Sequence, residues 1–479
     1  MKKLWFILMT LGLVAAFCAQ ASALDVKFSG SFYAAGMYQD KTTLNKNTWI
    51  SGQGTSSDPY VYHTPGPGTA FYYQRLRVRT EFIVSPGLKL VTRFDAMERA
   101  WGAARSSVTE PMIDSAGTRA ENENIAFDLA YLRYESPLGD FNIGFMQKGG
   151  WGTDFGNNLV YRGALLWGKY FPKTGLYVWG EVAQLNDNSY SATNVTTYSD
   201  RDNVEYMAGI NYYGIKNVEI GIMYDYSRFA SGRNYYEAYK AYGFDYGYVT
   251  AAHLIEPYVK ARFGPVSIES EIHYAFGDWI KFDGVHTGYS DMSISDFQAY
   301  IKARADFGPA YVGGIFAYCA GDDPGTADRL EGGYVNAGRE FNPTLIMFNS
   351  ERTDWAGAIP GYNTGVSPVN PQYYAYSYID GIMQNAWFFQ IFGGVKPIDN
   401  LDIMASLSYA NADKKPTSVW LYNDYGYELD LTATYKITKN LTYMIGGGYL
   451  FTGKFFKGTG ENNEVNDNYL VLNKLTLTF

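Results

Sequence analysis

The chain has 479 residues, of which 47% are hydrophobic, 17% aromatic and 18% charged, and its formal net charge is −9. The negative charge argues against a nucleic-acid partner, and four His and two Cys are too few for multi-haem or disulfide-stapled classes. The hydrophobic content argues against wholesale disorder. The many aromatic residues and Gly favour an all-β protein.

The N-terminus has the features of an export signal. Residues 1–3 form a basic start, residues 4–17 an apolar run, and residues 21–23 a small-residue cleavage site. We therefore predict a Sec signal peptide over residues 1–23 and a single mature domain over residues 24–479. No later apolar stretch reaches the roughly 20 residues of a transmembrane helix, which leaves a soluble exported protein or a β-barrel.

Apolar and polar residues alternate with a period of two along most of the mature chain. In one segment Leu76, Val78 and Phe82 alternate with charged residues, and in another Leu429, Leu431 and Tyr435 do so. Each such segment runs for about ten residues, the length of a tilted membrane strand. The pattern predicts an antiparallel transmembrane β-barrel.

The connections between these segments are of two kinds. Short turns rich in Pro, Gly, Asn or Lys are predicted at 85–87, 136–139, 171–175, 214–217, 263–265, 307–309, 396–400 and 438–440. Long polar connections are predicted at about 38–69, 97–122, 148–160, 185–202, 229–249, 277–293, 320–385, 411–425 and 452–466. This alternation predicts about 18 strands, with 16 as the alternative, and both termini on the side of the short turns.

The last segment carries a specific pattern, in which apolar residues occupy alternate positions up to the terminal one: Tyr469, Val471, Leu475, Leu477 and Phe479. Here the chain resembles the Gram-negative outer-membrane porins, whose last strand ends in Phe after such an alternation. The run Gln74 to Arg79 also looks like their early arginine-bearing strand. The resemblance implies an outer-membrane location amid lipid and lipopolysaccharide, assembly by the barrel-assembly machinery through the last strand, and a homotrimer.

Charged residues that face the inside of such a barrel are candidates for lining a pore. By parity, two neighbouring segments are expected to form a basic strip with carboxylates beside it, and a later segment a second basic zone: Arg75, Arg77, Arg79, Lys89 and Arg93, with Glu81 and Asp95, and then Lys302 and Arg304. Arg suits carboxylate or phosphate solutes because its charge is permanent and its donor fork is rigid. The alternative is that these charges pair with one another and serve the structure.

Two other features leave alternatives open. The connection 320–385 either folds inward to narrow a channel or forms an extracellular cap, and a cap or partial plug is slightly favoured. Aromatic residues near strand ends, such as Tyr131, Tyr134 and Tyr170, are expected in girdles at the membrane interfaces. The Tyr-rich stretch 235–248 keeps sugar-stacking surfaces as another interpretation.

Catalysis is not supported by the sequence. The four histidines, His63, His253, His273 and His286, show no metal-ligand spacing, and no G-x-S-x-G or phosphate-binding motif occurs. We therefore expect no enzyme, no metal site and no cofactor. The favoured function is a water-filled channel for small hydrophilic solutes or ions, and the alternative is a structural or receptor barrel that sheathes or docks a partner such as an electron carrier.

Overall fold

The computed structural model describes residues 25–46, 49–51, 61–63, 66–102, 125–148, 150–157, 161–188, 200–233, 247–284, 290–362, 378–379 and 381–479. The predicted signal peptide and most of the Tyr-rich stretch lie outside these residues. Within them, no helix has the length and apolar character needed to cross a membrane.

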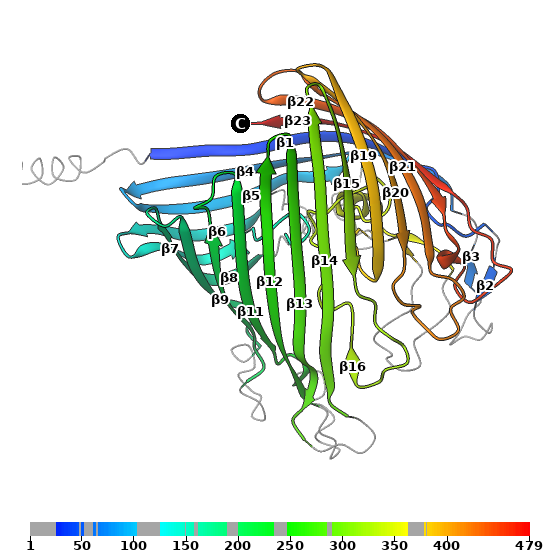
Figure 1. Cartoon of the computed structure of the whole chain (residues 1–479), viewed down its shortest axis with the longest axis horizontal. Helices are drawn as coiled ribbons and strands as arrows, with labels where there is room; N and C mark the ends of the chain where they lie inside the picture. Colours follow the sequence, from blue (N-terminus) through cyan, green and yellow to red (C-terminus); the bar gives the residue numbers. More distant parts are fainter. Residues whose placement is uncertain are drawn as a thin grey trace, which may run out of the picture.

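Eighteen of the described strands close into one antiparallel barrel, in which each strand pairs with its neighbours along the chain (Figure 1). They are β1 (Asp25–Gln39), β4 (Thr69–Ser85), β5 (Leu88–Ala100), β6 (Ile125–Ser136), β7 (Gly139–Gln147), β8 (Tyr161–Phe171), β9 (Leu176–Asn186), β10 (Asn203–Tyr212), β11 (Val218–Phe229), β12 (Tyr248–Phe263), β13 (Val266–Phe282), β14 (Met292–Phe307), β15 (Ala310–Cys319), β19 (Ala386–Ile398), β20 (Leu401–Asn411), β21 (Asp424–Lys436), β22 (Leu441–Thr452) and β23 (Asn468–Thr478). The predicted number of 18 is confirmed, and the alternative of 16 was wrong.

The first and last strands close the barrel, and β23 lies beside β1 in Figure 1. The register runs from Ser31 opposite Thr478 to Gln39 opposite Leu470. Beyond β23, the N–H and the carbonyl of Phe479 both bond to the backbone of Gly30, at 3.0 and 2.8 Å. The terminal residue therefore extends the closing pair by one further step.

The connections follow the predicted division into short turns and long loops. All eight predicted turns join consecutive barrel strands, as between β12 and β13 or between β21 and β22. The long connections hold small elements of their own: β2 (Trp49–Ser51), β3 (Val61–His63), β16 (Arg329–Leu330), α3 (Ser350–Ala356), β17 (Ile359–Pro360), β18 (Tyr378–Ile379) and a 3-10 turn, η1 (Lys454–Lys457). β16 pairs in parallel with β14, outside the meander of the barrel.

The strands present an apolar outer face and a polar inner face. On β21, Tyr427, Leu429 and Leu431 are exposed on the outside, whereas Glu428 and Asp430 between them are buried. A strand crossing a bilayer must bond all its backbone groups to other strands, which a closed barrel achieves. An apolar exterior around such a barrel is the architecture of an outer-membrane protein.

Aromatic residues gather on this outer face near strand ends. Tyr134 and Tyr170 are about half exposed there, in agreement with the predicted girdles. Tyr131 was wrongly assigned to a girdle, because its hydroxyl accepts a hydrogen bond from Arg79 inside the barrel. Its even-numbered neighbour Leu132 is the exposed residue.

Candidate functional site

The connection between β15 and β19 folds into the barrel, and we call it the long inner loop (320–385, described at 320–362, 378–379 and 381–385). Its central contact is with Glu428 on the inner face of β21. One carboxylate oxygen accepts the N–H groups of Leu345 and Ile346, at 3.0 and 2.6 Å, and the other accepts the N–H of Met347, at 2.8 Å. The alternative of an inward-folded segment, left open by the sequence, is therefore the one observed.

Further strands hold the long inner loop from other directions. On β14, Asp296 accepts the N–H of Val335 at 2.9 Å, and on β19 the amide of Gln390 donates to the carbonyl of Pro343 at 2.6 Å. On β23, Lys474 pairs with Glu351 of α3. Because these strands lie at separate places around the ring, the loop is fixed inside the lumen (Figure 1).

A second segment, residues 148–157, also turns inward, and we call it the short inner loop (Gly149 excepted). Trp151 is buried against Tyr258 of β12, and Thr153 donates its N–H and its hydroxyl to Glu271 of β13, each at 2.6 Å. Phe155 meets Phe341 of the long inner loop edge to face at 5.3 Å. The two inner loops are thus in contact with each other.

The predicted basic strip lies on the inner faces of β4 and β5, and the structure brings its members together. Tyr73, on the same face of β4 as the arginines, is buried against Trp355 of the long inner loop. Arg77 forms a bidentate salt bridge with Asp95, with N–O distances of 2.6 and 2.7 Å. The remaining pairs are Arg75 with Glu98 at 3.5 Å, Arg79 and Lys89 with Glu81 at 3.3 Å, Lys89 with Glu135 at 3.7 Å and Arg93 with Asp128 at 2.8 Å.

These pairs cancel the net positive charge that the basic residues of the strip would otherwise carry. Five cations face five carboxylates, so the strip is a charge-balanced ladder and not a positive surface. The second zone is balanced too, because Arg304 pairs with Asp306 at 2.9 Å and Lys302 lies 3.9 Å from Glu269. The side chains of this zone are about one third exposed, so they remain accessible to solutes.

Sequence reasoning missed a buried charged group on the adjoining wall. Arg162 of β8, almost fully buried, donates to Glu181 of β9 and to Glu205 of β10, at 2.7 and 2.6 Å. The signal was present, since each residue lies at an inward position of three consecutive strands. Strand 161–171 has a weak alternation, which obscured the parity of Arg162.

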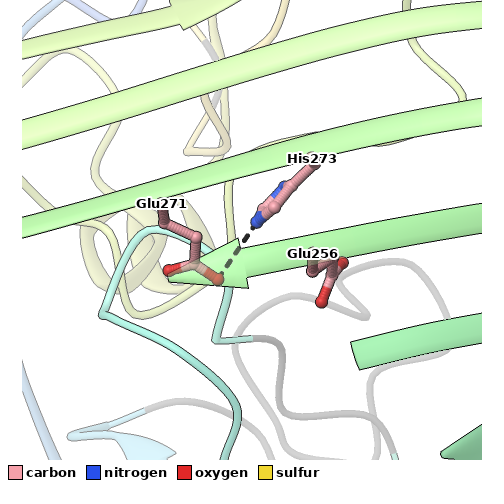
Figure 2. Close-up of side chains that lie close together, drawn as sticks. All are labelled: Glu256, Glu271 and His273. Carbon is pink, nitrogen blue, oxygen red and sulfur yellow. Dashed lines mark hydrogen bonds and ion pairs between the residues drawn. The ribbon is translucent and has the colours of Figure 1, made fainter. Parts of the chain in front are cut away.

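The sequence also missed a cluster on the hairpin of β12 and β13. Glu256, Glu271 and His273 are all buried, and one potential ligand atom from each lies within 4.8 Å of the others. Figure 2 shows the imidazole of His273 bonded through Nε2 to Glu271, at 3.2 Å, with Glu256 beside them. Sequence spacing gave no sign of this cluster, because strand pairing brings His273 next to residues that lie apart in the sequence.

Where the long inner loop leaves β15, two neighbouring aspartates accept hydrogen bonds from the backbone of the loop. Burial raises the pKa of Asp322 from 3.8 to about 6, against the opposing effect of the Glu331 N–H that it accepts at 3.0 Å. Next to it, Asp323 accepts the N–H of Gly325 and pairs with Lys414 at 3.0 Å, and both contacts hold the pKa of Asp323 below its usual value.

Comparison with solved structures finds the same barrel architecture in other proteins. OccK9 (OpdG) of Pseudomonas aeruginosa superposes with a TM-score of 0.50 at 12% identity, over 95% of this chain and 99% of that one. The outer membrane channel DcaP of Acinetobacter baumannii gives a TM-score of 0.43 at 10% identity, over 96% of this chain and 99% of that one. No protein-family model and no curated protein matches the sequence. The chain therefore has the fold of outer-membrane porins, as the sequence pattern predicted.

Proposed function

We propose that the protein is a channel of the outer membrane through which small hydrophilic solutes or ions diffuse. The observation that carries this proposal is the inner surface of the closed barrel, where accessible charged pairs line β4 and β5 while apolar residues face outward. Side chains in the lumen of a large barrel determine what passes. No catalytic role is proposed for any described residue.

A charge-balanced wall supports weak ion selectivity. The ladder of β4 and β5 has alternating charges a few ångströms apart, so its field decays over a short distance and orients polar solutes that pass close by. Strong selection of anions would need unpaired cations. We therefore propose a channel that discriminates by size and by polar contact more than by net charge.

The alternative of a sheath around a partner protein is less well supported. A sheath needs a lumen that its own chain leaves clear, whereas two inner loops here contact each other inside the barrel. The loops support a narrowed channel for small molecules instead. We also retain as proposals an export signal at 1–23, assembly through the C-terminal strand ending in Phe479, contact with lipopolysaccharide, and a homotrimer.

The test is conductance in a planar lipid bilayer. Purified mature protein is expected to produce discrete conductance steps, and a protein that inserts but conducts no more than bare lipid would contradict the proposal. Two variants then test the ladder through the reversal potential in a KCl gradient. Arg77→Gln alone leaves Asp95 unpaired and is expected to shift the potential toward cation preference, whereas Arg77→Gln combined with Asp95→Asn is expected to leave it unchanged.

A further inference from the structure

The hairpin of β12 and β13 places two carboxylates and an imidazole together on the inner wall of the barrel. Tyr258 pairs with Glu271 and Ile255 pairs with Tyr274, which puts Glu256 and His273 side by side on neighbouring strands. Ile272 and Tyr274 are exposed on the outer face, so the alternate residues Glu271 and His273 face the lumen. All three groups of the cluster come from these two rigid strands.

Glu256 is the unusual member of this cluster. It is only 5% exposed, and its carboxylate has no hydrogen-bond partner among the described residues, yet one of its oxygens lies within 4.8 Å of the ligand atoms of Glu271 and His273. Buried carboxylates are normally hydrogen-bonded, paired with a cation or bound to a metal ion. The opposite charges that act on Glu256 come from His273 and Lys148, and no hydrogen bond joins either of them to its carboxylate among the described residues. A bound cation would supply that direct contact.

The other two groups are already arranged as ligands would be. Thr153 occupies one oxygen of Glu271 with two hydrogen bonds, which orients the carboxylate and leaves the other oxygen toward His273. That oxygen lies 3.2 Å from Nε2 of the imidazole. Metal–ligand bonds of about 2.0–2.1 Å in a tetrahedral site put neighbouring ligand atoms about 3.4 Å apart, so the observed separation is close to that of a bound pair.

The short inner loop leaves no room for a side chain at this place. A Cβ added to Gly156 would lie 2.3 Å from Oε1 of Glu271 and 2.8 Å from Nε2 of His273. These are the two atoms that would bind a cation. The backbone of the loop therefore passes directly over the ligand atoms and covers them from the lumen.

We propose that Glu256, Glu271 and His273 form a binding site for a single divalent transition-metal cation, with Zn²⁺ as the probe. Two carboxylates neutralise the charge of a dication, and the imidazole favours Zn²⁺ over Ca²⁺ or Mg²⁺. A cation there joins the wall strands to the short inner loop, because Thr153 holds the ligand Glu271.

The test is Zn²⁺ binding by the refolded mature chain in detergent, measured by calorimetry and by metal analysis after dialysis. Wild-type protein is expected to bind one Zn²⁺ per chain. Glu256→Gln and His273→Gln are each expected to weaken binding by at least about 10- to 100-fold, the effect of losing even a group that only orients a ligand. Matched controls are Glu269→Gln, a lumen carboxylate beside Lys302, and His253→Gln, which bonds to Tyr224 on the outer face; both are expected to bind Zn²⁺ as the wild type does.

Several outcomes would overturn the proposal. Absence of stoichiometric Zn²⁺ in the wild type would show that a proton, and not a metal ion, neutralises the carboxylates of the cluster. Equal loss in Glu269→Gln or His253→Gln would show that binding occurs elsewhere. Should His273→Gln fail to fold, Co²⁺ bound to wild-type protein provides a second readout, since a tetrahedral site with nitrogen and oxygen ligands gives intense visible bands and an octahedral hydrated ion does not.

Discussion

Replacing Glu428 by Gln tests whether one carboxylate holds the long inner loop inside the barrel. The carboxylate accepts three backbone N–H groups, from Leu345, Ile346 and Met347. The amide of Gln offers a single acceptor oxygen, and its NH₂ group must face at least one of these donors. The substitution removes a negative charge and keeps the size of the side chain, so packing is unchanged.

The magnitude follows from the hydrogen bonds that the substitution removes or weakens. A hydrogen bond to a charged group contributes about 1.5–3 kcal/mol, and a neutral bond about half as much. Losing one bond and weakening two costs about 3–6 kcal/mol, from which relief of repulsion with Asp430, on the same strand face, subtracts. We expect a net cost of about 2 kcal/mol after this relief, which raises the undocked population of the loop about 30-fold.

Hydrogen exchange of the amides of residues 345–347 measures this population, because exchange there requires local opening. Glu428→Gln is expected to exchange about 30-fold faster at these amides, in line with the free-energy change. Glu269→Gln is the control, since it removes the same charge from the lumen beside Lys302 and away from the loop. Equal exchange in the two variants would refute the assignment of Glu428 as the anchor.

Changes at three further residues test other parts of the barrel. Deleting Phe479 removes both backbone bonds to Gly30 and is expected to lower the yield of folded protein, measured as the heat-modifiable band on gels. Phe479→Ala keeps those bonds and is expected to give a yield between those of the deletion and the wild type. Equal yields in the two variants would contradict a backbone contribution. Arg162→Met leaves two carboxylates without their partner, buried Glu181 and partly buried Glu205, and is expected to destabilise the barrel by about 3–5 kcal/mol in urea unfolding. A change below about 1 kcal/mol would show that these carboxylates are well solvated. Because the pKa of Asp322 is raised, its stabilisation of the long inner loop is complete below pH 3.8 and is lost as the pH rises through about 6. Proteolysis of the loop is therefore expected to become faster across this pH range. Asp322→Asn is expected to abolish this pH dependence.

The barrel itself could be predicted because its strands and turns depend on residues that are close together in the sequence. Alternation of apolar and polar residues follows directly from a strand with lipid on one side, and the eight short turns carry residues with turn-forming chemistry. The inward position of Arg77 and Asp95 follows from the same parity. Their pairing then needs only the register of one hairpin, which the turn at 85–87 sets to within a residue.

The inner loops could not be predicted because their contacts are long-range and use backbone donors. The N–H groups that Glu428 binds belong to residues about 80 positions earlier, and every residue except Pro carries such a group. By contrast, the cluster of Glu256, Glu271 and His273 could have been predicted from the sequence. A tight turn at 263–265 places Glu256 opposite His273 and leaves Glu271 on the same face, so counting across the predicted hairpin brings the three groups together.

The lumen carboxylates therefore serve two different purposes on two parts of the wall. From β4 to β10 they pair with Arg and Lys, so that neutralising one partner leaves an opposite charge in the channel. From β13 to β21, apart from Glu269 and Asp306, which pair with Lys302 and Arg304, the carboxylates of Glu271, Asp296 and Glu428 accept backbone N–H groups from the inner loops. Neutralising these three is therefore expected to loosen a loop without freeing a cation. Substitutions on the first part should alter ion preference at constant conductance, whereas substitutions on the second should alter conductance at constant ion preference. A lumen in which both kinds of substitution changed the same quantity would contradict this division.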